Sequence, residues 1–116
     1  MIGTGHEHAA IKEVISNMPV LKDRKAWESV HGISLSEFVS MEHQLKDHRI
    51  EISGDEADAA TYFQAVHHRT DGGKWLLGGA YHIRLQRLVD GWRVKSVKMV
   101  PVWSWDEPAG GAALAA

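Results

Sequence analysis

Four runs of apolar and β-favouring residues, separated by turn signals, constrain the fold of this chain more than any other feature. The runs are Leu45–Ile52, Ala57–Arg69, Lys74–Val89 and Trp92–Trp105, and the turns are Ser53–Glu56, Thr70–Gly73 and Asp90–Gly91. Asp-Gly between two such runs favours a hairpin, because a type I′ turn needs positive φ at both central residues. The second half of the chain is therefore predicted to form an antiparallel four-stranded meander.

Alternation within the runs predicts which face of this sheet is buried, since successive side chains of a strand point to opposite sides. In the third run one parity is almost wholly apolar and the other is mostly polar. The apolar set is Trp75, Leu77, Gly79, Tyr81, Ile83 and Leu85, whereas His82, Arg84 and Gln86 belong to the other. In the second run Thr61, Phe63, Ala65 and His67 share a face. One side is predicted to be core, and the other to carry water or chemistry.

Two features predict that the sheet is strongly curved. The apolar parity of the fourth run changes at Ser96, which indicates a bulge or a strand covered on both faces. Gly78-Gly79 lies inside the third run, and glycine within a strand usually marks a bend or a close approach of two backbones.

The segment before the sheet predicts three helices. Apolar residues at helical spacing mark His6–Met18, which Pro19 ends, and Arg24–Val30 follows with Asp23 as its N-cap. The third begins at the capping box Ser34–Glu37, with a hydrophobic staple of Ile33 and Phe38, and runs to Met41. Because the apolar face of the sheet needs a cover, these helices are predicted to pack on it, giving an α+β fold.

Composition sets the broad class. The chain has 116 residues, of which 44% are hydrophobic and 24% charged, so residues 1–106 are predicted to form one domain and Glu107–Ala116, rich in Gly and Ala, a disordered tail. A net charge of −2 argues against nucleic acid as a partner. The absence of cysteine excludes disulfides and cysteine-ligated zinc. No run approaches a membrane span and no leader is visible, so we expect no membrane partner and cytoplasmic residence.

Eight histidines are the side chains most able to carry chemistry. His6, His8 and His31 lie in or beside the predicted helices, and we expect them to be solvated. His43, His67 and His82 lie at or in the predicted strands, where a histidine is either a satisfied core residue or a catalyst. Asp23 is likewise either a plain helix cap or part of a site. No histidine spacing matches a helix-borne zinc motif, so no metal is expected.

Several stretches resemble the SnoaL-like branch of the NTF2-like superfamily, in which a strand pair closes a conical pocket. They are Gly79–Arg87, Asp90–Val94 with Trp103, and the upstream strand and turn Ile50–Ala57. His43 stands where the scytalone dehydratase and hexachlorocyclohexane dehydrochlorinase group carries its catalytic histidine. Ala10-Ile11, Asp23 and Trp27 resemble the first helices of that group, whose aspartate lies at the Asp23 position, and His67 falls where scytalone dehydratase has a second active-site histidine.

The resemblance implies a small hydrophobic ligand, no cofactor, and activity as a lyase or an isomerase. The implied catalytic residues are Asp23, His43 and His67, and the implied substrate-binding residues are Phe63, Tyr81, His82 and Trp103. An aspartate that accepts a hydrogen bond from one imidazole nitrogen raises the basicity of the other, which can then remove a proton. The alternative is a ligand-binding or protein-interaction module of the same fold without catalysis.

One departure from this family concerns the pocket wall. Members have a strand hairpin and a long helix ahead of the position of His43, and the fifteen residues Glu28–Glu42 are too few to hold both. The NTF2-like cone is therefore expected to be incomplete. A gaping pocket, a wall supplied by a second subunit, and loss of activity are the three interpretations. A homodimer is expected, because an uncovered sheet face favours association.

Overall fold

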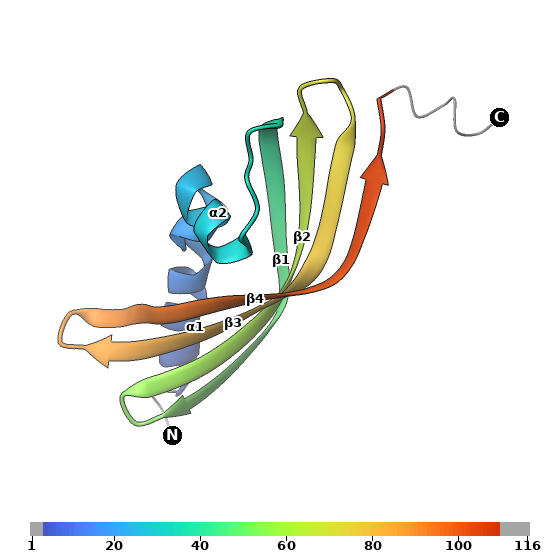
Figure 1. The fold of residues 1–116 in the computed structure, drawn as a ribbon. Coiled ribbons are helices and arrows are strands. Elements are labelled where there is room, and N and C mark those ends of the chain that lie inside the picture. Colours follow the sequence, from blue (N-terminus) through green and yellow to red (C-terminus); the bar gives the residue numbers. More distant parts are fainter. Residues whose placement is uncertain (1–3, 110–116) are drawn as a thin grey trace.

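A computed structural model describes residues 4–109 as two α-helices, a short 3₁₀ helix and four strands (Figure 1). The helical elements are α1 Thr4–Ser16, η1 Pro19–Leu21 and α2 Arg24–His31, and the strands are β1 Phe38–Ser53, β2 Glu56–Arg69, β3 Lys74–Leu88 and β4 Gly91–Glu107. The strands pair in the order β1-β2-β3-β4, each antiparallel to the next. The predicted α+β class and the antiparallel meander are confirmed. Residues 110–116 of the predicted tail lie outside the described residues.

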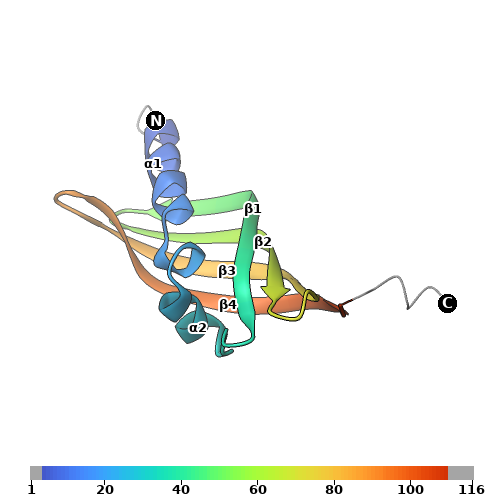
Figure 2. The same ribbon diagram turned by 90° about the horizontal axis from the view of Figure 1, so that it is seen from above.

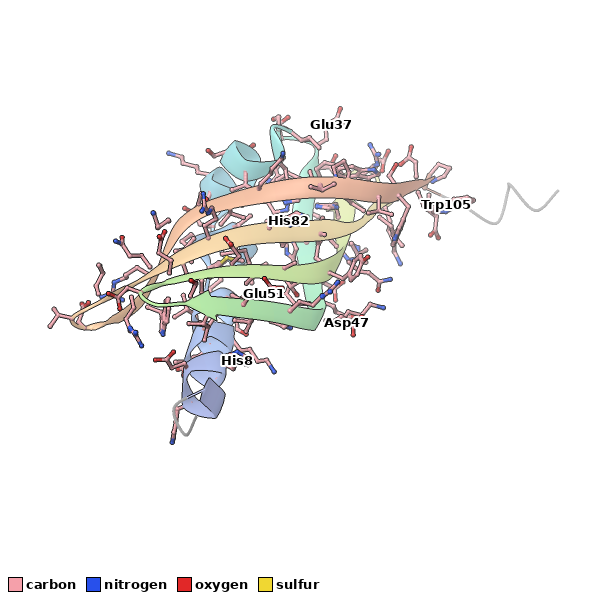
Figure 3. All side chains as sticks on the ribbon, turned by 90° about the horizontal axis from the view of Figure 1, so that it is seen from below. His8, Glu37, Asp47, Glu51, His82 and Trp105 are labelled. Carbon is pink, nitrogen blue, oxygen red and sulfur yellow. The ribbon has the colours of Figure 1, made fainter. Side chains whose placement is uncertain are left out.

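The helices cover one face of the sheet, which we call the inner face (Figure 2). The main core residues of the helices are Ile11, Ile15, Met18, Val20 and Trp27, and those of β2–β4 are Phe63, Leu77, Tyr81, Ile83, Leu85 and Trp92. The β3 residues among them, Leu77, Tyr81, Ile83 and Leu85, belong to the set of alternating residues predicted to be buried, so that prediction is confirmed. The opposite, outer face carries exposed side chains such as Glu51 and His82, which Figure 3 shows from the side away from the helices.

The sheet is sharply curved, as predicted, and all four strands bend near their middle (Figure 1). The β3–β4 register shifts between Arg84 and Leu85, which leaves Lys95 unpaired, and between Gly78 and Gly79, which leaves Val102 unpaired. The first shift is the bulge predicted beside Ser96. At the second, a Cβ atom on Gly79 would collide with the backbone carbonyl oxygen of Val100, so glycine permits the close approach of the two strands there.

Neither short hairpin uses a type I′ turn, which requires positive φ at both central residues and was predicted for Asp90-Gly91. In the β1–β2 turn only Gly54 has positive φ, at 62°. In the β3–β4 connection positive φ occurs at Gly91, at 126°, after the loop residues Val89 and Asp90. The hairpins are thus placed where the sequence predicts them, but with other turn geometries.

The predicted third helix, from Ser34 to Met41, is wrong, because β1 begins at Phe38. Ser34 Oγ accepts from the backbone N–H of Ser36 at 3.3 Å, in a local turn that starts no helix. The guanidinium of Arg24 donates to the carbonyl oxygens of Leu35 and Phe38, at 2.6 and 2.9 Å. These contacts tie the segment to α2, and a turn closed by the Phe38 N–H and the Leu35 carbonyl oxygen at 3.0 Å leads into β1. Only residues 32–37 separate α2 from β1, so the structure contains no hairpin or helix between them.

Candidate functional site

Three histidine rings gather around the indole of Trp27 on the inner face. His31 comes from α2, His43 from β1 and His67 from β2. Trp27 and His31 are four residues apart and so share one helix face, where their rings stack at a centroid distance of 4.0 Å. The His67 and Trp27 rings meet edge to face with their centroids 5.0 Å apart, and the centroids of the His43 and His67 rings are 6.3 Å apart. We call these four residues the histidine cluster.

His43 is held as a neutral ring by its contact with Trp27. The indole Nε1–H donates to His43 Nε2 at 3.1 Å. Because an indole nitrogen can only donate, this imidazole nitrogen carries no proton, and the neutral ring is protonated at Nδ1. Burial lowers the pKa of His43 to about 4, and the neighbouring His67 adds to the effect.

His67 presents an unpaired acceptor inside the core. Its Nδ1 donates to the backbone carbonyl oxygen of Trp75 at 3.0 Å, which leaves Nε2 as the unprotonated nitrogen. The ring is fully buried, and Nε2 has no hydrogen-bond partner among residues 4–109. Burial lowers the pKa of His67, while the hydrogen bond to Trp75 opposes that change. A lone pair in this environment can accept a proton or a hydrogen bond.

His31 forms a buried pair with Tyr81 of β3, with Nε2 and the phenolic oxygen 2.6 Å apart. Burial raises the pKa of Tyr81 above its ordinary value, so the phenol keeps its proton. Burial lowers the pKa of His31 to about 3, with smaller contributions from His43 and His67. If Nε2 donated, both the phenolic O–H and Nδ1 would lack partners among residues 4–109. The arrangement with fewer unpaired groups has the Tyr81 hydroxyl donating to Nε2 and the proton of His31 on Nδ1.

An apolar groove of about 610 Å³ opens between the end of α2 and β3–β4, beside the histidine cluster. Residues that line it include His31, Ile33, Trp75, Leu77, Met99 and Trp103. Among residues 4–109, no Asp, Glu, Lys or Arg lines it. The groove is open where the segment between α2 and β1 is short, which matches the expectation of an incomplete cone.

The structure does not join Asp23 to His43. Asp23 is exposed, and its carboxylate accepts from the backbone N–H of Lys25 at 3.1 Å as the N-cap of α2. His43 Nε2 is already bonded to Trp27. The helix cap therefore accounts for Asp23, because the first backbone N–H groups of α2 need an acceptor.

The predicted substrate-binding residues fall into two groups. Phe63 and Tyr81 are buried beside the histidine cluster with their rings stacked 4.4 Å apart, and Trp103 lines the groove with 42% of its surface exposed. His82 does not join them: it is exposed on the outer face (Figure 3). Strand alternation explains this, because His82 follows the inward-facing Tyr81.

Sequence reasoning missed His31 and the central role of Trp27. His31 was expected to be solvated, but only 8% of it is exposed. The spacing of Trp27 and His31 on α2 is the signal that could have found the pair. Within residues 4–109 no group of three His, Asp or Glu side chains is arranged to hold a metal ion.

The two helices and the curved antiparallel sheet form an NTF2-like fold. An NTF2-like superfamily protein from Salmonella enterica aligns with a TM-score of 0.52 and 20% identity, over 58% of this chain and 49% of that one. More specifically, the chain belongs to the SnoaL-like domain family, which matches residues 6–98. A search of curated proteins by sequence found no match.

Two solved structures cover nearly the whole chain. The Kfla4162 protein from Kribbella flavida has 22% identity and a TM-score of 0.68, over 87% of this chain and 94% of that one. A type 3 hexachlorocyclohexane dehydrochlorinase from Novosphingobium barchaimii has 14% identity and a TM-score of 0.75, over 94% of both chains. At these identities the likeness establishes the fold. None of the described helices is both long and apolar enough to cross a membrane.

Proposed function

We propose that this domain binds a small hydrophobic molecule in the groove between α2 and β3–β4. The observation that carries this proposal is an apolar groove of about 610 Å³ that contains the buried, neutral His31 in its wall. Its volume lies within the range of roughly 300–1,000 Å³ typical of small-molecule sites. Most of the side chains that line the groove are apolar, and His31 and Ser104 add polar groups, as is usual in such sites.

Binding of ethylbenzene, a small apolar probe, tests the proposal. Trp75 and Trp103 line the groove, so their indole N–H signals in two-dimensional NMR should shift on titration with the probe. Met99→Arg places a charge in the groove and should abolish the shifts. Val100→Arg is the matched control, because Val100 pairs with Ala80 and points to the outer face. Unchanged binding by Met99→Arg would refute the groove as the site.

A second candidate function is a cofactor-independent lyase or isomerase that uses His43 and His67, with Asp23 as the partner of His43. The unpaired Nε2 of the buried His67 favours it, because a free imidazole lone pair near a second histidine can move a proton. Without a carboxylate at hydrogen-bond distance, however, the pKa of His43 is about 4, which makes that ring a weak base at neutral pH. Binding is therefore the better supported function.

Asp23→Asn tests the proposed Asp23–His43 dyad. Asparagine caps a helix about as well as aspartate, so the fold should be kept. If Asp23 reaches His43 in solution, loss of its charge lowers the pKa of His43 in an NMR titration. The same pKa in both proteins would exclude the dyad and leave the binding function.

We also propose that the domain is a homodimer and that it acts in the cytoplasm. Exposed aromatic residues on the outer face of the sheet support association, with Tyr62 at 50%, Trp103 at 42% and Trp105 at 63% exposure. The absence of cysteine among the 116 residues is compatible with a reducing compartment.

A further inference from the structure

A hydrogen bond that depends on the protonation of a histidine joins α2 to the sheet. The indole Nε1–H of Trp27 donates to Nε2 of His43 in β1 at 3.1 Å. An indole nitrogen can only donate, and both nitrogens of a protonated imidazole are donors as well. The contact therefore requires a neutral His43, and uptake of one proton by that ring breaks it.

Two further contacts between α2 and the strands lack this property. The hydroxyl oxygen of Tyr81 can accept as well as donate, so a protonated His31 would keep a hydrogen bond to it. The guanidinium of Arg24, which donates to the carbonyl oxygen of Phe38 at 2.9 Å, stays charged throughout the physiological pH range. Neither contact is broken by a proton.

The surroundings of His43 disfavour its protonated form. The titratable side chains packed against it are His67 of β2, with ring centroids 6.3 Å apart, and His31 of α2, whose pKa His43 lowers. Glu42, the preceding residue of β1, points to the outer face and contacts His68 there at 2.8 Å. Burial lowers the pKa of His43 to about 4, and among residues 4–109 no carboxylate opposes this change.

Release of α2 from the sheet would expose the histidine rings to water. In the released state His43 takes up a proton near its ordinary pKa of 6.5, whereas in the docked state it does so only near pH 4. Between these values the released state binds more protons, so acidification favours it. The groove loses a wall at the same time, because His31 and Ile33, at and just beyond the end of α2, line it.

We propose that acid releases α2 from the sheet by breaking the Trp27–His43 hydrogen bond, and that the released form no longer holds a ligand in the groove. The second part rests on the proposed small-molecule function, and the first part does not. His43 is a positioning residue in this device, because it contacts Trp27 and is not among the residues that line the groove.

Hydrogen exchange of the α2 backbone amides in the full chain, followed by NMR between pH 6 and pH 5, tests the first part. Protection factors, which correct for the pH dependence of exchange itself, give the equilibrium constant for opening of α2. This constant should rise about tenfold, or more if several rings are exposed, because each exposed ring takes up one proton. Amides in the middle of β2 and β3 should stay better protected. A constant that does not change, or α2 and sheet amides that open together at every pH, would overturn the proposal.

The variant His43→Gln isolates the proton, because the amide oxygen of glutamine accepts a hydrogen bond but takes up no proton. The pH dependence of α2 opening should be smaller in this variant by about tenfold per pH unit, the effect of one proton. The matched control His6→Gln removes a histidine at an exposed position of α1 and should keep the full dependence. Equal pH dependence in His43→Gln and in the unaltered chain would refute the role of His43.

Ethylbenzene at ten times its dissociation constant tests the second part on the unaltered chain. If only the docked form binds the probe, the opening constant of α2 should fall about tenfold. Binding that leaves this constant unchanged would overturn the second part, while the proposed function and the release by acid stand. No binding at any pH would overturn the proposed function and the second part, and leave the first part to the exchange measurement.

Discussion

Burial, rather than a charged neighbour, sets the proton affinity of the histidine cluster. Each of its three rings has a lowered pKa for which loss of water is the largest cause. His43 and His67 lower the pKa of His31 further, and His67 lowers that of His43, since a proton on one ring would repel a proton on the next. The cluster is therefore a neutral hydrogen-bonding unit at physiological pH.

Acidification is expected to destabilise the protein between about pH 6.5 and pH 4. In the unfolded chain His31 and His43 take up protons near pH 6.5, whereas in the folded protein they do so only near pH 3 and pH 4. The unfolded state thus binds more protons in this window, and the free energy of unfolding falls by up to about 1.4 kcal/mol per pH unit for each histidine.

Urea denaturation at pH 7.5, 6.5, 5.5 and 4.5 measures this dependence. His31→Phe should show a shallower decrease, because one of the two buried groups is removed. A free energy of unfolding that does not change between pH 6.5 and 4.5 would contradict the burial of neutral rings.

Tyr81→Phe should destabilise the fold by about 1–3 kcal/mol, because it leaves Nε2 of His31 buried without a partner. Tyr62→Phe is the matched control: Tyr62 is half exposed, and its loss of a hydroxyl should change stability by less than about 0.5 kcal/mol. Urea denaturation of both variants gives the comparison, and equal effects would indicate that the His31–Tyr81 hydrogen bond adds no stability.

At the scale of the elements, the bend of β3 against β4 depends on Gly79 more than on Gly78. An added Cβ at Gly78 meets the side chain of Trp103, which is partly exposed and can turn away. At Gly79 it meets the backbone of Val100, which cannot move without disturbing the sheet.

Gly79→Ala should therefore cost about 1–3 kcal/mol of stability, and Gly78→Ala clearly less. Thermal or urea unfolding of the two variants tests this order. A larger loss for Gly78→Ala would mean that the position of Trp103, and not the approach of the backbones, controls the bend.

The sheet could be predicted from the sequence because its signals are local. Alternation placed Tyr81 inward, and turn residues marked the hairpins. The conformation of the segment after α2 could not be predicted in this way. Contacts from Arg24 to the carbonyl oxygens of Leu35 and Phe38 determine it, although the local sequence at Ser34 resembles a capping box. Such contacts join residues eleven and fourteen positions apart and leave no periodic pattern.

For the candidate site, too, local patterns predicted positions along the chain but not contacts across the fold. The strand position of His67 beside Phe63 and Ala65 predicted its place on the inner face. A hydrogen bond between Asp23 and His43 could not be predicted, because it depends on distances across the fold. In the structure the carboxylate of Asp23 instead caps α2 by accepting from a backbone N–H of that helix. His31 was missed because the predicted helix ended at Val30, one residue before it.

At the scale of the whole molecule, the chain is elongated. Its radius of gyration is 16.8 Å, against about 13 Å for a compact domain of 100 residues, and its longest dimension is 59 Å. The strands have 14 to 17 residues and extend beyond the helices that cover them. The outer face, which these helices do not cover, carries an exposed apolar surface that includes Tyr62, Trp103 and Trp105.

Sedimentation equilibrium should give about twice the chain mass of 12.9 kDa if the proposed homodimer forms through this surface. Trp105→Lys, on the outer face of β4, should weaken the dimer, because a charge would replace an apolar contact. Val39→Lys is the control, since Val39 is as exposed as Trp105 but lies at the start of β1. A monomer at all concentrations would refute the homodimer.

The strand order β1-β2-β3-β4 also bears on how the chain reaches its native state. Every strand pairs with its neighbour in the sequence. Each hairpin can therefore form from its own turn outwards, before the other hairpins have formed. The packing of the helices on the sheet depends on contacts across the fold, such as that of Trp27 with His67 of β2. We expect the hairpins to form early and α1 and α2 to dock late, so that the histidine cluster is among the last parts to assemble.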